Sequence, residues 1–249
     1  MSSESSETET HSGNVTVARN RVPSAVRDAL LTGGFVPGNA VTLRGLASRL
    51  GVSPMPVREA IRALAAANAL DILPNGHIRV PAMTRRRFNE LLHTRVLLEP
   101  HLATLAIHDL SRAVPDLVRV DDAIDENLVN GDVTAYMRHN HEFHFRIYRA
   151  AGSEIILPLV EHVWLQFAPF MRTVYARIGT SALEDRHKEA IAAIKQGDRE
   201  ALRLVIERDI LDGMGLIGRS VPEAPETEDV PRTLRNGSVA GAASGIRPD

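Results

Sequence analysis

The sequence of 249 residues contains no cysteine, which excludes disulfides and any chemistry that depends on a thiolate. Aromatic residues make up only 4% of the chain, so its core must consist mainly of Leu, Ile, Val and Ala, which suits packed helices better than a β-sandwich. No apolar run approaches the ~18 residues of a membrane span, and the acidic N-terminus MSSESSETETHSGN lacks the apolar segment of a secretory signal. These absences favour a mainly α-helical protein located in the cytoplasm, with no membrane partner.

Acidic residues are scarce in one segment of the chain and frequent in the rest. The formal net charge is −2, yet residues 19–87 hold eleven arginines and only three acids, a formal charge of +8. A basic segment joined to an acidic remainder indicates a polyanion as the partner of the first part alone. The alternative is a general preference for arginine over lysine, but that preference does not explain why the acids avoid this segment.

Composition divides the chain into four parts. Residues 1–18 are mainly Ser, Glu and Thr, and residues 219–249 are rich in Pro, Gly and Ser, so both ends are predicted to be disordered. Between them the pattern predicts a small domain over 19–81 and an all-helical antiparallel bundle over 82–218. After a first long helix, further amphipathic stretches predict helices at about 114–130, 132–151, 154–177, 182–196 and 199–217.

The small domain has the pattern of a winged helix-turn-helix. A helix in VPSAVRDALLTG is followed by a short helix in VTLRGLASRLG, with Thr42 as its cap and Gly51 as its end. A further helix in VSPMPVREAIRALAAAN follows almost at once. Two short strands in DILPNGHIRVP then flank the turn signal Pro74-Asn75-Gly76 and would form the wing.

Two prolines stand at the start of the helix that follows Ser53. The backbone N–H groups of a first helical turn have no intrahelical partner, so Pro54 and Pro56 cost little there and stiffen the helix start. Such an N-terminus favours phosphate, and in helix-turn-helix proteins it enters the major groove. Arg58 lies one turn in, where it would reach a guanine edge or a phosphate.

The stretch LRGLASRLGVSPMPVREAIRALAAANAL, followed by NGHIRV, resembles the DNA-binding domain of the GntR family of bacterial regulators, and the similarity covers residues 20–81. The resemblance implies DNA contacts from Arg44, Ser53, Arg58 and the wing tip Asn75-Gly76-His77, which would enter the minor groove. Met55 stands where the family often has a base-reading residue, and it is a candidate for contact with a thymine methyl group. Arg49 is a candidate phosphate contact, with a solvated surface position as the alternative.

Three histidines in RHNHEFHFRIY, residues 138–148, suggest a metal site, although the motif H-E-x-x-H is absent. Asn140 and His144 share a helix face, while His187 and Asp209 lie at similar distances from Gly197, where a helix hairpin would turn. Convergence of these four side chains would suit Zn²⁺, Ni²⁺ or Mn²⁺. The alternative for each histidine is a structural or solvent-facing role, which is favoured for His139, His141 and His162.

RVLLEPHLATLA and HKEAIAAIKQGDREALRLVIERD resemble the first long helix and the last hairpin of the FCD effector domain, which follows GntR-type domains in the FadR subfamily. Many members bind a metal through one Asp and three His, and these fall on Asn140, His144, His187 and Asp209, so two ligands are exchanged here. Arg95 matches an arginine that lines the effector cavity, where its guanidinium suits a carboxylate. The alternative for Arg95 is a buried ion pair with Glu99, and Arg172 on a neighbouring helix is a second candidate for effector binding.

The sequence therefore predicts a homodimeric transcriptional regulator of the GntR family and FadR subfamily, and most such regulators are repressors. It would bind a palindromic double-stranded DNA operator and respond to a small organic acid, assisted by one divalent metal ion. Two alternatives remain: a metal-sensing regulator, and a metal-dependent hydrolase with a basic appendage. No nucleophile paired with a general base is evident, so an enzyme is not expected.

Overall fold

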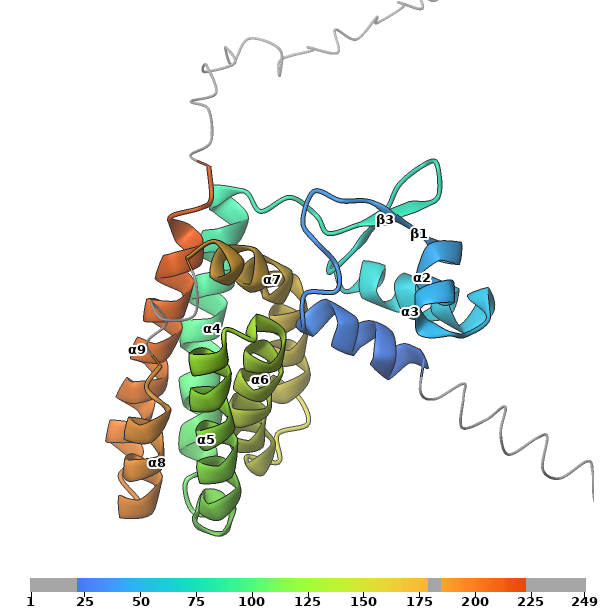
Figure 1. The fold of residues 1–249 in the computed structure, drawn as a ribbon. Coiled ribbons are helices and arrows are strands. Elements are labelled where there is room, and N and C mark those ends of the chain that lie inside the picture. The colour runs from blue at the N-terminus through green and yellow to red at the C-terminus, as the bar shows by residue number, and fades with distance from the viewer. Residues whose placement is uncertain (1–21, 179–184, 223–249) are drawn as a thin grey trace, which may run out of the picture.

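A computed structural model of the protein describes residues 22–178 and 185–222 (Figure 1). Both ends were predicted to be disordered, and of these residues 1–18 and 223–249 lie outside the described part of the chain. The described chain is mainly helical, with a small winged helix-turn-helix beside an upright bundle of helices (Figure 1). This architecture confirms the predicted fold class.

The winged helix-turn-helix begins with a helix over residues 22–31, whose apolar face is buried at Val22, Val26 and Leu30. The elements that follow are β1 (Val41–Thr42), α2 (Leu43–Leu50), α3 (Pro54–Ala66), β2 (Asp71–Ile72) and β3 (His77–Arg79). The strands form an antiparallel sheet in the order β1-β3-β2. Strand β1 was not predicted, because two residues are too few to show an alternating pattern.

The turn between α2 and α3 follows the predicted capping. Thr42 Oγ1 accepts a hydrogen bond from the backbone N–H of Gly45 at 3.0 Å, and Gly51 ends α2 in a left-handed conformation with φ 65°. Helix α3 begins at Pro54, directly after Ser53, whose side chain makes no capping hydrogen bond. The exposed Ser53 hydroxyl is therefore not used by the helix that it precedes.

The bundle consists of α4 (Arg85–Ala106), α5 (Val114–Asn130), α6 (Val133–Ala150), α7 (Ile156–Ile178), α8 (His187–Gln196) and α9 (Arg199–Gly218), with a short 3-10 turn η1 (Leu110–Ala113) before α5. Helix α4 packs against α6, α7 and α9, while α5 packs against α6 and α8, so the helices enclose one shared core. None of the described helices combines the length and the apolar sequence needed to span a bilayer.

The helix predicted over 182–196 is shorter in the structure, where α8 begins at His187. The backbone N–H of Arg186 donates to Asp209 Oδ1 at 3.1 Å, and that of His187 donates to Asp185 Oδ1 at 3.3 Å. These side chains satisfy the first free N–H groups, so the chain reaches α8 in a non-helical conformation. Residues 179–184 lie outside the described part.

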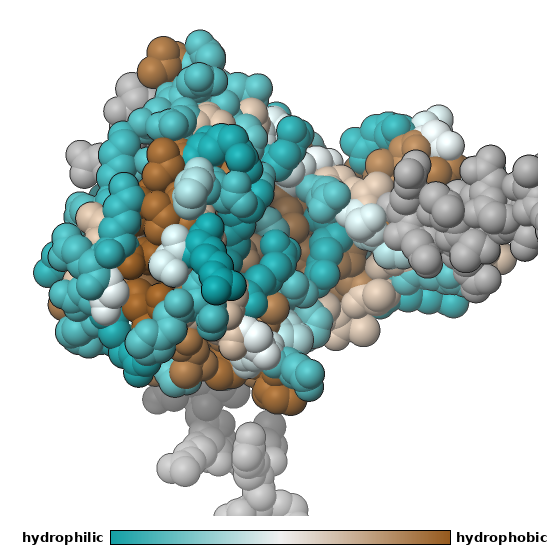
Figure 2. Space-filling view, turned by 90° about the horizontal axis from the view of Figure 1, so that it is seen from below, coloured by the Kyte–Doolittle hydropathy of each residue, from teal (hydrophilic) through white to brown (hydrophobic). Residues whose placement is uncertain are grey.

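Apolar side chains are largely enclosed, and the face seen from below in Figure 2 is mostly hydrophilic with narrow apolar bands. The core contains large aromatic residues in spite of their low overall content, including Trp164, Tyr148 and Phe167, each exposed by 2% or less. Many of them lie on α6 and α7, where they surround a small group of buried polar side chains.

Helix α7 contacts both domains. Its Glu161 forms an ion pair with Arg27 at 3.2 Å, and Gln166 Nε2 donates to the carbonyl of Ala67 at 3.2 Å, just after α3. Arg87, from α4, donates to the carbonyl of Asn68 at 2.6 Å and to Gln166 Oε1 at 2.8 Å. The C-terminal end of α3 is therefore held by side chains of the bundle.

Candidate functional site

The N-terminal end of α3 faces a groove of about 770 Å³ on the winged helix-turn-helix. The predicted DNA-contacting residues that line it are Arg44, Arg58, Asn75, Gly76 and His77. Arg44 lies in the first turn of α2, Arg58 in the second turn of α3, and the other three at the wing tip. Three separate segments thus bring cationic and polar side chains to one surface.

The arginines of this surface have no acidic partner among the described residues. Arg44 and Arg58 are exposed and lie outside every ion pair of that part of the chain, although other arginines in the same domain, such as Arg27 and Arg79, are paired. Met55 in the first turn of α3 is 63% exposed, Ser53 is exposed before α3, and Arg49 is exposed in the last turn of α2, but these three residues do not line the groove. Exposed cations without carboxylate neighbours are suited to bind phosphate and base edges.

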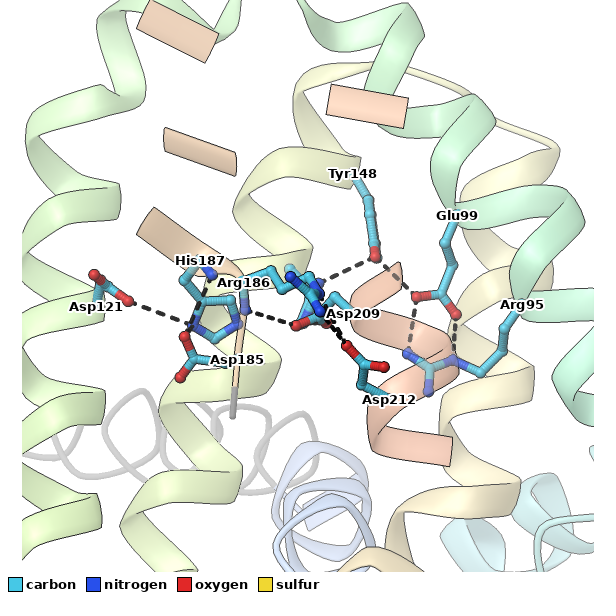
Figure 3. Close-up of polar contacts among 10 residues, drawn as sticks. Arg95, Glu99, Asp121, Tyr148, Asp185, Arg186, His187, Asp209 and Asp212 are labelled. Carbon is cyan, nitrogen blue, oxygen red and sulfur yellow. Dashed lines mark hydrogen bonds and ion pairs between the residues drawn. The ribbon is translucent and has the colours of Figure 1, made fainter. Parts of the chain in front are cut away.

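A second polar group lies inside the bundle and starts at Arg95 (Figure 3). Arg95 and Glu99 are four residues apart on α4 and face the core, where Nε–Oε1 is 2.6 Å and Nη2–Oε2 is 3.0 Å. The guanidinium also lies over Phe167 and Trp164, at 4.0 Å and 4.7 Å from the ring centroids. The ion pair offered as the alternative for Arg95 is therefore present, and both partners are buried.

Tyr148 connects this ion pair to His144. Its hydroxyl donates to Glu99 Oε2 at 2.8 Å and lies 3.1 Å from His144 Nδ1. Because the hydroxyl has one proton and gives it to Glu99, it accepts from Nδ1–H of His144, which assigns the protonated nitrogen of that ring. A neutral His144 then presents an unprotonated Nε2 on its other side.

Asp209, on α9, faces that nitrogen. His144 Nε2 and Asp209 Oδ2 are 3.2 Å apart, so either a second proton on His144 or a bound cation must lie between two groups that otherwise both accept. Burial alone would raise the pKa of Asp209, but the hydrogen bond and charge of His144, the charge of His187 and the Arg186 N–H hold that pKa well below its usual value. Asp209 is therefore ionised and available as a ligand.

His187 lies next to this pair at the start of α8. Its ring stacks on Phe143 with centroids 4.0 Å apart and is 5.3 Å from the ring of His144. Burial lowers the pKa of His187, but Asp121, Asp209 and Asp185 outweigh that effect and raise it. Neither ring nitrogen of His187 has a hydrogen-bond partner among the described residues, although the side chain is buried.

The donor set fits a divalent metal ion. Ligand atoms of His144, His187 and Asp209 lie within 4.8 Å of one another, and the orphaned nitrogens of His187 need a partner. Asn140, one turn before His144 on α6, is buried and lines the same cavity as His144 and Asp209. That cavity, which Arg95 also lines, has a volume of about 30 Å³, enough for a water molecule or an ion but not for an organic acid.

The remaining candidates lie elsewhere. Arg172 does not line the cavity; its guanidinium donates to Thr134 Oγ1 and its side chain packs against Gly33 at the junction of the domains. His141 stacks on Phe145 with centroids 4.2 Å apart, and burial, with help from Arg149 and His144, lowers its pKa to about 3, so it is neutral. His139 Nδ1 contacts Asn127 Oδ1 at 2.9 Å.

Asp121, Asp185 and Tyr148 were not among the predicted site residues, although the first two lie beside His187 and the third contacts His144. The spacing 140, 144, 148 places three polar side chains on one face of α6 and would have indicated Tyr148. Asp121 lies among the buried apolar positions of α5, with Val120 and Ile124, which is an unusual place for an acid. Asp185 belongs to no helix and carried no periodic signal.

Comparison with known proteins matches two family models in succession, bacterial regulatory proteins of the gntR family over residues 18–80 and the FCD domain over 90–212. The transcriptional regulator McbR of Escherichia coli is 27% identical over 187 residues, which cover 74% of this chain and 85% of that protein. A solved structure of E. coli McbR superposes with a TM-score of 0.76 at 24% identity, covering 81% of this chain and 97% of that one.

Two further relatives are named as repressors. The "Probable D-xylose utilization operon transcriptional repressor" of Paenarthrobacter nicotinovorans is 26% identical over 188 residues, covering 74% of this chain and 83% of that protein. The gluconate operon transcriptional repressor of Bacillus licheniformis is 23% identical over 212 residues, covering 79% and 84% respectively. These similarities extend over both domains rather than over the winged helix-turn-helix alone.

Proposed function

We propose that this chain, which belongs to the GntR family of bacterial regulatory proteins and carries an FCD domain, is a homodimeric repressor controlled by a small carboxylic acid. Family membership makes it a DNA-binding transcriptional regulator and not an enzyme, so the hydrolase alternative is set aside. The names of the xylose and gluconate operon repressors support repression, and gluconate is itself a carboxylate.

The DNA-binding part of this proposal is supported by one observation. Arg44, Arg58 and the wing tip line a single groove at the N-terminus of α3, and no carboxylate of the described chain neutralises the two arginines. In a two-fold symmetric dimer, two such surfaces would bind the half-sites of a palindrome. The test is a gel-shift titration of the full-length protein with DNA from upstream of its own gene, against a scrambled sequence. Equal affinity for both would overturn the proposal.

The effector part depends on the buried polar group. His144, His187 and Asp209, with Asn140 as a weak neutral donor, would hold one divalent ion, Zn²⁺, Ni²⁺ or Mn²⁺. When bound, that ion supplies positive charge and an open coordination position for a carboxylate oxygen. Arg95 provides a second cationic anchor, although Glu99 now occupies its guanidinium. An organic acid must therefore displace Glu99 and widen the cavity, which gives its binding a conformational consequence.

Metal sensing is the second candidate, because the cavity of about 30 Å³ accommodates an ion without rearrangement. In that case Zn²⁺ or Mn²⁺ alone would change operator affinity. The gel shift is repeated with metal and with a chelator, each with and without a panel of carboxylic acids. A response to the ion alone identifies a metal sensor, whereas a response that requires the acid identifies a metabolite sensor.

Replacing Tyr148 by phenylalanine is expected to weaken Zn²⁺ binding by roughly 10-fold to 100-fold, because the ring nitrogen of His144 loses the group that fixes its orientation and protonation. Isothermal titration calorimetry of the metal-free protein measures this change. Tyr136→Phe is the matched control, since Tyr136 lines the same cavity and pairs with Tyr175 instead of a histidine. Equal losses in the two variants would assign Tyr148 a packing role only.

Helix α7 is proposed to couple the two domains, since Trp164, Met171 and Tyr175 line the cavity while Gln166 holds the end of α3. Gln166→Ala removes the contacts to Ala67 and Arg87, and we expect faster amide hydrogen exchange over residues 64–69. Exchange in α8, which lies outside the hydrogen bonds of Gln166 with Ala67 and Arg87, should not change. Unaltered exchange at the end of α3 would contradict this coupling.

A further inference from the structure

A second group of ligating side chains lies on the other side of His187. Asp121 comes from α5, Asp185 from the segment before α8, and His187 from the first turn of α8 (Figure 3). Ligand atoms of the three residues lie within 4.8 Å of one another. Asp121 is exposed by 3% and His187 by 1%, so two of the three groups are buried in the bundle.

The distances in this group differ from those of ordinary hydrogen bonds. His187 Nδ1 is 3.5 Å from Asp121 Oδ1 and 3.6 Å from Asp185 Oδ1, beyond the range of about 2.7–3.2 Å for an N–H···O bond. Ligands held at about 2.1 Å around a tetrahedral ion are separated by about 3.4 Å. The distances from His187 Nδ1 to the two carboxylate oxygens are thus close to the distance between two ligands of the same metal ion.

Two of the atoms that face each other are unsatisfied. Asp121 Oδ1 and His187 Nδ1 are both buried, and neither has a hydrogen-bond partner among the described residues. Buried polar atoms in folded proteins almost always have one, so a pair of orphaned atoms aimed at each other indicates a missing group between them. A cation would satisfy both atoms at once.

The charges of Asp121 and Asp185 also favour a bound cation. Within the described chain, His187 is the sole ion-pair partner of Asp121 and of Asp185. The nearby cations are used elsewhere: Lys188 pairs with Asp125 at 2.6 Å, and Arg186 pairs with Asp212 and Glu189. Two carboxylates therefore share one imidazole, and burying that much negative charge is unfavourable without a further positive charge.

We infer that Asp121, Asp185 and His187 form a second binding site for a divalent cation, distinct from the group of His144 and Asp209. Two carboxylates and one imidazole make it richer in oxygen than the first group, which suits Zn²⁺ or Mn²⁺. Ion binding at this site requires neither DNA nor an organic acid. It also does not require His144 or Asp209, the ligands that belong to the first group alone. Its ligands join α5 to the start of α8, so a bound ion fixes the position of Asp185 and His187 relative to α5.

The two sites compete for His187. A neutral imidazole has one unprotonated nitrogen, so an ion bound at Nδ1 leaves Nε2 protonated and unable to bind a second ion. Occupation of the Asp121 site therefore removes one ligand from the group of His144 and Asp209. Each chain is expected to hold one tightly bound ion that distributes between the two positions, and the wild-type stoichiometry is one.

The test titrates Zn²⁺ into metal-free full-length protein by calorimetry. A His144→Ala chain, which lacks a ligand of the first group only, is expected to retain one Zn²⁺ per chain. Adding Asp121→Asn to it should weaken binding at least tenfold. Asp125→Asn is the matched control in the same background, because Asp125 lies on the same helix and its one ion-pair partner among the described residues is Lys188. It should leave the affinity unchanged.

Two results overturn the inference: no Zn²⁺ binding by the His144→Ala chain, or equal affinity for the Asp121→Asn and Asp125→Asn versions of it. Circular dichroism checks the fold, and Asp185→Asn replaces Asp121→Asn if the latter does not fold, with the same expected loss. Wild-type affinity in the His144→Ala chain would place the ion at the Asp121 site and reject the metal site of the proposed function. A weaker affinity that depends on Asp121 supports both sites.

Discussion

Arg58→Ala is expected to abolish sequence-specific DNA binding without disturbing the fold. The side chain is exposed in the second turn of α3, lines the groove with Arg44 and the wing tip, and makes no ion pair with a described residue that its removal would break. An arginine that donates two hydrogen bonds to guanine contributes about 1–3 kcal/mol of discrimination. The dimer of the proposed function would lose that contribution twice, so the affinity for the operator should fall by roughly 30-fold or more.

Fluorescence anisotropy with operator and scrambled duplexes, at several salt concentrations, distinguishes a contact of Arg58 with a base from a contact with a phosphate. If Arg58 reads a base, the ratio of the two affinities collapses; if it binds phosphate, both affinities fall together and the salt dependence becomes weaker. Arg86→Ala removes the same charge from an exposed residue that pairs with Glu90 at the start of α4, and should retain specificity. An unchanged affinity ratio in the Arg58→Ala protein would refute base reading by Arg58.

Arg95→Ala is expected to lower the free energy of unfolding by about 3–5 kcal/mol, because it leaves the carboxylate of Glu99 buried without its partner. Replacing both partners, as Arg95→Met with Glu99→Gln, should recover most of that loss. The methionine fills the space beside Phe167 and Trp164, and the glutamine oxygen still accepts the proton of Tyr148.

Urea unfolding followed by circular dichroism measures the stability of both variants. The double variant then separates stability from function, since it retains the fold but has no guanidinium for a carboxylate. An acid that weakens operator binding of the wild type should have no effect on that of the double variant. If the double variant is as unstable as Arg95→Ala, the loss in free energy of unfolding comes from the lost packing of the guanidinium rather than from the unpaired carboxylate of Glu99.

The helix boundaries were largely predictable because they depend on local chemistry. Thr42 and Gly51 delimit α2, and prolines mark the start of α3, since capping and proline geometry act within a few residues. Helix α5 has its predicted bounds at 114 and 130, where Gly131 follows in a left-handed conformation. Strand β1 was not predictable, because its two residues are held by pairing with β3.

The candidate site was predictable in part. The spacing of Asn140, His144, His187 and Asp209 follows from the regular rise of a helix, and the structure brings ligand atoms of the last three together. The contacts of His187 with Asp121 and Asp185 were not predictable, because they join α5 to a segment with no periodic pattern. The same limit applies to the contacts between Gln166 and the end of α3.

By itself, the sequence determined the succession of helices, the basic DNA-binding module and the presence of polar residues on apolar helix faces, because these depend on neighbours along the chain. Only the tertiary structure decided that Arg95 is engaged by Glu99, that Arg172 lies at the domain junction, and that His187 belongs both to a group with His144 and Asp209 and to a group with Asp121 and Asp185. The physical reason is that side-chain pairing inside a bundle depends on the rotation and separation of packed helices, which no local pattern specifies.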